Sequence, residues 1–138
     1  MKDFITQEFA EVTNVSMIVI RKRTIIRMMT SSPKGYENPP AGCVMDSTIT
    51  KKNDFFLVPM NTNLGTVTPT HYVVVESGSL EPHLIQKVAY ALSHMYFNWA
   101  GTVKIPAPCQ YARKLGELTS SHLHASPSAT LNETLFYL

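Results

Sequence analysis

The chain has 138 residues, which suits one domain of ordinary size. Hydrophobic residues make up 44% and charged residues 16%, so we expect a packed core rather than a disordered chain. The formal charge of +2 is too small to identify a nucleic-acid-binding protein by itself. Two cysteines make neither a disulfide framework nor a four-ligand zinc site. No apolar run is long enough for a membrane span, and the acidic start is unlike a secretory signal, so we expect an intracellular protein.

The first third of the chain predicts a helix, a strand and a loop. Residues 2–12 place apolar side chains on one helical face and predict a short amphipathic helix. Residues 15–20 form a continuous apolar run, which is typical of a strand covered on both faces in the middle of an α/β sheet. The Pro- and Gly-rich segment 31–42 predicts a loop.

The remainder predicts strands followed by helices. Residues 43–49, 55–60 and 71–75 are strand candidates separated by turn-like stretches, which favours a meander. Helical spacing of apolar residues begins near Glu81, continues to Tyr96, and has Pro82 in the first turn. A second helix is predicted to start at Pro106 or Pro108 and to run through Leu118. The apolar tail 131–138 is expected to be docked. The fold class is therefore mixed α/β, and the buried first strand needs neighbours that this chain does not evidently supply.

Basic side chains cluster directly after the first predicted strand. Arg21, Lys22 and Arg23 are consecutive, and Arg27 and Lys34 follow before the next acid. The strand ends of α/β sheets often carry ligand-binding loops, and phosphate oxygens are the natural partners of such a cluster. The alternative is a solvated strand end whose charges serve solubility.

Other reactive side chains favour structural roles. Asp46 lies in a strand candidate without the additional acids that a two-metal nuclease requires, so we expect a structural or surface role. The pair His122 and His124 has no nearby Cys or acid, which favours a helix C-terminus over a metal site. His94 is expected to be packed or capping, and Cys109 to be a buried thiol rather than a nucleophile.

Aromatic residues gather at the end of the first long helix. Tyr96, Phe97 and Trp99 lie close to basic residues, and such aromatics can stack on nucleobases. At helical spacing, however, large aromatics more often belong to the core, and we favour that interpretation.

Several separated motifs together resemble a known family. They are NPPAG (38–42), DSTIT (46–50), DFFLVP (54–59), GTVTPTHY (65–72), YFNWAGTV (96–103) and PAPCQYA (106–112). In this order they resemble the C-terminal half of the PIWI domain of an Argonaute protein. The Asn-Trp and Cys-Gln-Tyr-Ala variants and the ending Phe136-Tyr137-Leu138 are similar to the Piwi clade. The resemblance covers roughly residues 15–138.

The resemblance implies a partial RNase H-like fold that consists of the later strands and two C-terminal helices. It places residues 1–14 in an N-terminal helix of the truncated domain and residues 15–138 in the C-terminal part of the PIWI domain. The two catalytic Asp residues and the catalytic Glu of the family would lie upstream of Met1. Arg113 stands where the family has its catalytic His, and a permanently charged Arg cannot be a neutral metal ligand. We therefore expect no slicer activity.

The resemblance also implies contacts to a small guide RNA of the piRNA class and its target RNA. The matching guide-binding positions are Lys22, Arg23, Arg27, Tyr96, Lys104 and Gln110. Thr68 stands where the related Ago clade tends to have Arg. The terminal carboxylate of Leu138 would help to hold Mg²⁺ at the guide 5′ phosphate, a site that also requires a MID domain. No other cofactor is implied.

Three functions remain open at this point. The first is a guide-binding module of a silencing protein. The second is part of a guided RNA endonuclease whose acidic catalytic residues come from elsewhere, and the third is a degenerate duplicate without RNA affinity. We expect action in the nucleus or in perinuclear cytoplasm. An open sheet edge at residues 15–20 would receive a missing N-terminal PIWI or MID portion or would cause self-association.

Overall fold

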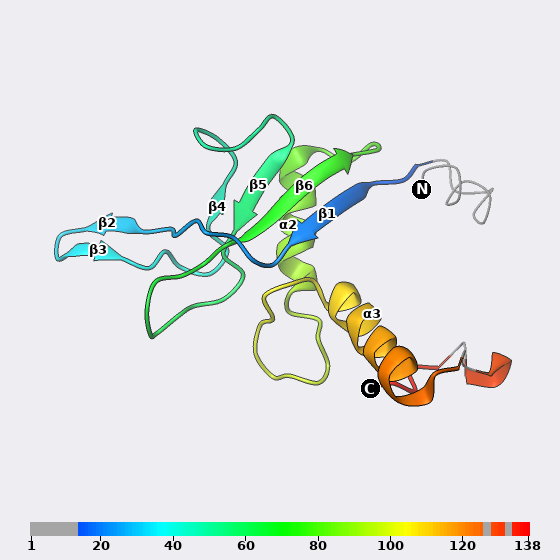
Figure 1. Cartoon of the computed structure of the whole chain (residues 1–138). Helices are drawn as coiled ribbons and strands as arrows, with labels where there is room; N and C mark the ends of the chain where they lie inside the picture. Colours follow the sequence, from blue (N-terminus) through cyan, green and yellow to red (C-terminus); the bar gives the residue numbers. More distant parts are fainter. Residues whose placement is uncertain (1–13, 126–127, 132–133) are drawn as a thin grey trace.

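The computed structural model describes residues 14–125, 128–131 and 134–138 (Figure 1). The helix predicted for residues 2–12 lies wholly outside these residues, as does all of the proposed N-terminal unit 1–14 except Asn14. In the described part, strands come first and helices follow, as predicted.

The main sheet has four antiparallel strands in the order β1-β6-β5-β4. They are β1 (Met17–Arg21), β6 (Thr70–Glu76), β5 (Asp54–Leu57) and β4 (Val44–Met45). The predicted meander is confirmed for β4, β5 and β6, which are neighbours in chain order. β1 joins beside β6, so the end of β1 lies next to the start of β6, with Arg21 opposite His71.

β1 does not lie in the middle of the sheet within the described residues; the structure has instead the open sheet edge that was expected at residues 15–20. β1 is an edge strand: it pairs with β6 on one side and with no other strand of the described residues. Ile18 and Ile20 pack against the core, whereas Val19 points to the other face and is 45% exposed. A continuous apolar run does not show whether other elements of the chain cover both faces of the strand, and for this reason the pattern predicted a central position for β1.

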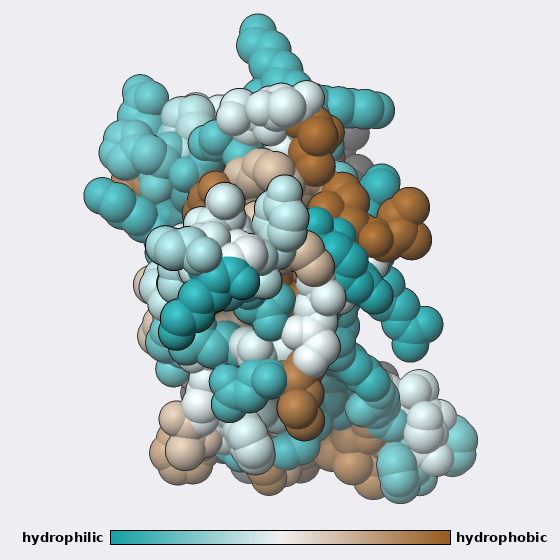
Figure 2. Space-filling model, turned by 90° about the vertical axis from the view of Figure 1, so that its left-hand side faces the viewer, coloured by the Kyte–Doolittle hydropathy of each residue, from teal (hydrophilic) through white to brown (hydrophobic). Residues whose placement is uncertain are grey.

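The loop predicted for residues 31–42 contains a short hairpin. β2 (Thr30–Ser32) pairs with β3 (Gly35–Glu37), and the hairpin projects away from the main sheet (Figure 1). Gly35 has a φ of 120°, a conformation that suits glycine, so the tight turn is possible. On the side of the molecule that the hairpin faces, exposed apolar side chains form separate groups among polar ones (Figure 2).

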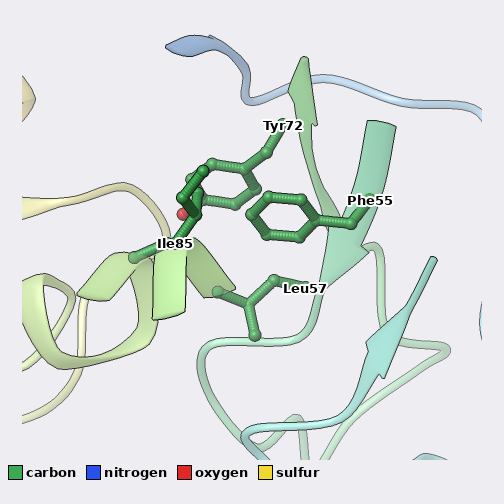
Figure 3. Close-up of a cluster of buried hydrophobic side chains, with 5 residues drawn as sticks. Phe55, Leu57, Tyr72 and Ile85 are labelled. Carbon is green, nitrogen blue, oxygen red and sulfur yellow. The ribbon is translucent and has the colours of Figure 1, made fainter. Parts of the chain in front are cut away.

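Side-chain alternation along β5 divides the core between the two faces of the sheet. Phe55 and Leu57 pack with Tyr72 and with Ile85 of helix α2 (Pro82–Leu92), as Figure 3 shows, and Ala89 of the same helix completes the cluster. The rings of Phe55 and Tyr72, which are directly opposite in the sheet, stack with centroids 4.8 Å apart.

The other face holds a second cluster that includes Phe56 and Val58 together with Met28 and Val67. Here Phe56 stacks on His71 across the same pair of strands, with centroids 4.4 Å apart. Both faces of β5 are therefore apolar and buried, which fixes this strand between two layers of side chains.

Helix α3 (Ala107–Leu118) continues into a π-helical turn (Thr119–Leu123), and a 3₁₀ turn (Ala129–Leu131) lies further along the chain. Pro82 occupies the first turn of α2 as predicted, but α2 ends at Leu92, before the aromatic segment that we expected it to include. The predicted docking of the tail is confirmed for Tyr137, whose ring meets that of Tyr111 of α3 edge-on with centroids 6.3 Å apart. Leu135 and Leu138 of the same tail are exposed. None of the helices in the described residues has the length and apolar character needed to cross a membrane.

Candidate nucleic-acid interface

The basic segment that follows β1 is fixed to the loop preceding β6. Thr24 Oγ1 donates a hydrogen bond to the Pro69 carbonyl (3.2 Å), and the Met28 N–H donates to the Val67 carbonyl (3.4 Å). Met28 itself is buried in the second core cluster. These contacts hold the backbone between the basic residues while the charged side chains point outward.

The connection between α2 and α3, residues 93–106, is fixed to the same region. Its two ends are joined by a hydrogen bond from the Val103 N–H to the Ser93 carbonyl (2.9 Å). The Oγ1 of Thr70, a fully buried residue at the start of β6, donates to the Lys104 carbonyl (2.7 Å). Lys104 therefore lies beside the start of β6, the point at which β1 ends.

A groove of about 390 Å³ opens where the two segments meet. This volume lies within the range of ordinary ligand sites. The groove contains one basic side chain from each segment, two aromatic residues, and a residue from the first turn of α3. The lining residues are Lys22, Met60, Tyr96, Asn98, Trp99, Thr102, Val103, Lys104, Ile105 and Gln110.

Positive charge is concentrated at this groove. Partial burial lowers the pKa of Lys104 below its usual value, and the charges of Lys22 and Arg27 lower it further. Lys104 therefore lies close enough to Lys22 and Arg27 for their positive charges to act on it. An anion bound beside Lys104 relieves this repulsion, because it stabilises the protonated form of that side chain.

The structure brings four of the six predicted RNA-contacting residues to one groove: Lys22, Tyr96, Lys104 and Gln110. Arg27 does not line the groove, but its charge acts on Lys104. Arg23 is exposed and is not part of the lining, and Thr68 is half-buried two residues before β6.

Lys34 lies at the turn of the β2–β3 hairpin, which projects away from the sheet (Figure 1). That the six predicted residues of the previous paragraphs contact RNA stays a prediction.

The prediction that the aromatic segment belongs to the core is wrong for two of its three members. Phe97 is 85% and Trp99 62% exposed, and only Tyr96 is half-buried, with its ring 5.1 Å from that of Tyr111. Because α2 ends at Leu92, the helical spacing of these aromatics has no structural meaning. The sequence signal for Trp99 as a groove residue is that it lies close to basic residues.

Arg113, which stands at the family's catalytic His position, lies on the surface of α3. Its Nε donates to Glu117 Oε1 (2.9 Å), one helical turn further on, and both side chains are more than half exposed. Asp46 is also exposed, and it accepts a hydrogen bond from Gln86 Nε2 (2.8 Å). Among the described residues, no three His, Cys, Asp or Glu side chains are grouped so as to hold a metal ion.

The remaining candidates have local partners. His94 is exposed, and its Nδ1 lies 2.9 Å from the Tyr90 carbonyl in the last turn of α2 while its ring meets the Tyr90 ring edge-on. Of the two predicted roles, capping fits this position and burial in the core does not. His122 Nδ1 lies 3.4 Å from the Glu117 carbonyl near the end of α3. Cys109 is exposed, so the expectation of a buried thiol is wrong. Partial burial of the thiol nevertheless raises its pKa, the opposite of what activates a nucleophile.

One acid–histidine pair was not predicted. His71 Nε2 lies 3.0 Å from Asp54 Oδ2, with both side chains largely buried between β5 and β6. Asp54 therefore begins a strand instead of lying in a turn, and its carboxylate is used within the fold. This pair lies on the sheet and does not line the groove.

Comparisons with known proteins agree with this architecture. The Piwi domain family model matches residues 2–124. Piwi-like protein Ago3 of Bombyx mori is 44% identical over 127 residues, which are 90% of this chain and 14% of that protein. Protein argonaute-3 of Drosophila melanogaster is 47% identical over 127 residues, 90% of this chain and 15% of that protein.

The crystal structure of Drosophila Piwi matches with a TM-score of 0.78 at 35% identity, covering 99% of this chain and 20% of that one. The alignments with the two curated relatives cover 90% of this chain. The chain thus spans about one seventh of the length of each relative. The predicted partial RNase H-like fold is confirmed, and the chain belongs to the Piwi domain family.

Proposed function

We propose that this chain contacts the sugar–phosphate backbone of a small guide RNA of the piRNA class, together with its target RNA, as part of a silencing protein. The observation that carries the proposal is the groove lined by Lys22, Tyr96, Lys104 and Gln110. These residues come from the end of β1, the α2–α3 connection and α3. Their meeting is a property of the fold and not of sequence proximity.

The chemistry of the groove suits a phosphate backbone. Lys22 and Lys104 supply point charges for phosphate oxygens, and Arg27 adds to the positive field. The amide of Gln110 and the phenol of Tyr96 are neutral hydrogen-bonding groups of the kind that contact phosphate and sugar. Such contacts are independent of base sequence, so the groove itself does not select a guide.

We further propose that the chain does not cut RNA. Arg113 is always protonated and forms an ion pair with Glu117 on the helix surface, so it can neither coordinate a metal ion nor accept a proton. Action as a nuclease would require the family's acidic catalytic residues, from an upstream part of the same protein or from a partner, and catalysis in spite of Arg113.

A divalent ion at the 5′ phosphate of the guide is a separate proposal that concerns Leu138. The residue is exposed at the end of the described tail, and its N–H donates to the Leu135 carbonyl (3.1 Å). A single terminal carboxylate fits Mg²⁺ as one oxygen ligand, but the ion takes about six. The other ligands would come from the guide phosphate, water and residues outside this chain. The bound ion would neutralise phosphate charge.

Retention of a 5′-phosphorylated 21-nucleotide RNA on a filter tests the binding proposal. The full chain should retain the RNA at 50 mM salt and lose most of it at 200 mM, because each phosphate contact releases counterions. Retention that does not change with salt, or the absence of retention at both concentrations, contradicts the proposal. The second outcome supports the alternative of a degenerate duplicate.

A cleavage assay tests the proposed lack of scission. The chain is incubated with Mg²⁺, a guide and a fully matched, end-labelled target RNA, and the Arg113→His variant is assayed in parallel. We expect no product from either protein. Specific product from the unmodified chain would show that Arg113 does not prevent catalysis and would favour the nuclease alternative.

The same proposal implies action inside the cell, in the nucleus or in perinuclear cytoplasm. It also implies that upstream PIWI and MID portions complete the guide site, from the same protein or from a partner. The unpaired edge of β1 is the place where such a portion would add to the sheet.

A further inference from the structure

The α2–α3 connection presents a large aromatic side chain that core packing does not explain. Trp99 is 62% exposed although tryptophan is usually among the most buried residues of a domain. It lines the same groove as Lys22 and Lys104. Phe97, two residues earlier, is 85% exposed but does not line the groove. The two aromatics therefore differ in what they face.

The backbone around Trp99 is held in place. The Phe97 N–H donates to Tyr111 Oη (2.8 Å), and the Trp99 N–H donates to the Tyr96 carbonyl (3.3 Å) in a tight turn. Together with the bonds that fix Val103 and Lys104, these contacts anchor the connection on both sides of the indole. A rigid position lowers the entropy cost of binding through this side chain.

Gly101 supports the position of the indole ring. A Cβ atom at this residue would lie 2.7 Å from Trp99 Nε1, closer than two such atoms approach in folded proteins. The indole therefore lies directly against the backbone of Gly101, in space that any side chain there would occupy. This contact backs one part of the ring, while more than half of the side chain stays open to solvent.

We propose that Trp99 is a stacking platform for one nucleobase of the RNA strand whose phosphates Lys22 and Lys104 hold. The inference rests on the proposed function and extends it from the backbone to a base. Alternating cations and aromatic rings are what single-stranded nucleic acids require, since phosphates and bases alternate along the strand. Every base has a π face, so this contact adds affinity without selecting a sequence.

The only tryptophan of the chain is Trp99, so intrinsic fluorescence reports directly on this contact. The full chain is titrated with a 5′-phosphorylated oligouridine and with an abasic oligonucleotide of the same length and charge. We expect the oligouridine to quench the fluorescence and to bind roughly tenfold more tightly. The abasic strand should bind with the same salt dependence and leave the fluorescence unchanged.

Variants separate stacking from folding. Trp99→Phe should keep the preference for the base-containing strand, and Trp99→Leu should abolish it, whereas Phe97→Leu, the matched control, should behave as the unmodified chain. Gly101→Ala should displace the indole and reduce the preference. Circular dichroism verifies that each variant is folded, and the fluorescence titration needs no variant at all.

The outcomes also separate the two proposals. Salt-dependent binding of both strands with equal affinity and no quenching overturns the role of Trp99 and leaves backbone binding intact. Equal losses in Trp99→Leu and Phe97→Leu overturn it as well. If neither strand binds at low salt, the proposed function is overturned, and the role of Trp99 with it.

Discussion

Replacement of Lys104 by Met gives the sharpest test of the charged groove. The charges of Lys22 and Arg27 act on Lys104, and the fold uses the backbone carbonyl of Lys104 rather than its ammonium group. The substitution therefore removes charge while the Thr70 hydrogen bond to the backbone is retained. We expect RNA binding to weaken while the stability of the free protein is unchanged or slightly improved, because repulsion with Lys22 and Arg27 disappears.

The magnitude follows from the number of cations. If Lys22, Arg27 and Lys104 each neutralise one phosphate, log Kd should rise with log salt concentration with a slope of about 2 for single-stranded RNA. This corresponds to a roughly 20-fold loss of affinity between ~50 and ~200 mM salt. Lys104→Met should reduce the slope by about 0.7 and weaken binding at low salt by about 1.5 kcal/mol, roughly tenfold in Kd.

The assay is fluorescence anisotropy of a labelled RNA at several salt concentrations. Lys51→Met is the matched control, since Lys51 is exposed before β5, at the end of that strand opposite the groove. It should change neither slope nor affinity beyond a small non-specific effect. Equal effects of the two substitutions would refute the reasoning, because the groove would then contribute no more than any surface charge.

The pH dependence of binding provides a second measurement on the same residue. The pKa of Lys104 is lowered, so this side chain loses its proton earlier than an ordinary lysine as the pH rises. Affinity should therefore begin to fall on the alkaline side, at a lower pH than an ordinary lysine at this position would cause. In Lys104→Arg the charge persists and the decline should disappear. The folded protein without RNA should become more stable over the same pH window, since the unfolded chain binds the proton more tightly.

Three further predictions concern the fold. Tyr72→Phe removes a buried hydroxyl that has no hydrogen-bond partner among the described residues, so the free energy of unfolding should rise by about 1 kcal/mol and Tm by about 4 °C; a lower Tm in calorimetry would contradict this. Leu57→Ala empties a fully buried site and should cost ~2–5 kcal/mol in urea unfolding, against less than about 0.5 kcal/mol for an exposed control such as Leu64→Ala. Val19→Lys places a charge on the open edge strand and should increase the monomer fraction in size-exclusion chromatography; an unmodified chain that is already monomeric would disprove self-association through β1.

The elements that the sequence predicts correctly are those in which a periodic pattern coincides with burial. β5 and β6 lie where apolar runs predict them, and α2 begins at the proline that marks its first turn. The β2–β3 hairpin escaped prediction because its three-residue strands are stabilised by pairing and a glycine turn, not by an apolar face. Tyr36, in the middle of β3, is 80% exposed.

The site was only partly accessible from sequence. Spacing alone indicated the basic segment that contains Lys22, and the family resemblance added Tyr96, Lys104 and Gln110. That these residues surround one groove depends on long-range contacts, such as the hydrogen bond between Thr70 and Lys104, which no local pattern encodes. Trp99 was assigned to the core because its spacing continues that of α2, and a helix that ends without glycine or proline nearby gave little warning in the sequence.

The buried hydroxyl of Thr70 has a consequence for how this molecule tolerates change. Thr70 pairs with Leu57 in the sheet, and its hydroxyl also donates a hydrogen bond to the carbonyl of Lys104. One residue therefore belongs both to the hydrophobic interior and to the scaffold of the groove. A core substitution that shifts β6 by a fraction of an ångström would therefore also move Lys104 and its ammonium group, although the substituted residue does not contact Lys104. Ligand affinity is thus sensitive to packing defects well before the protein unfolds.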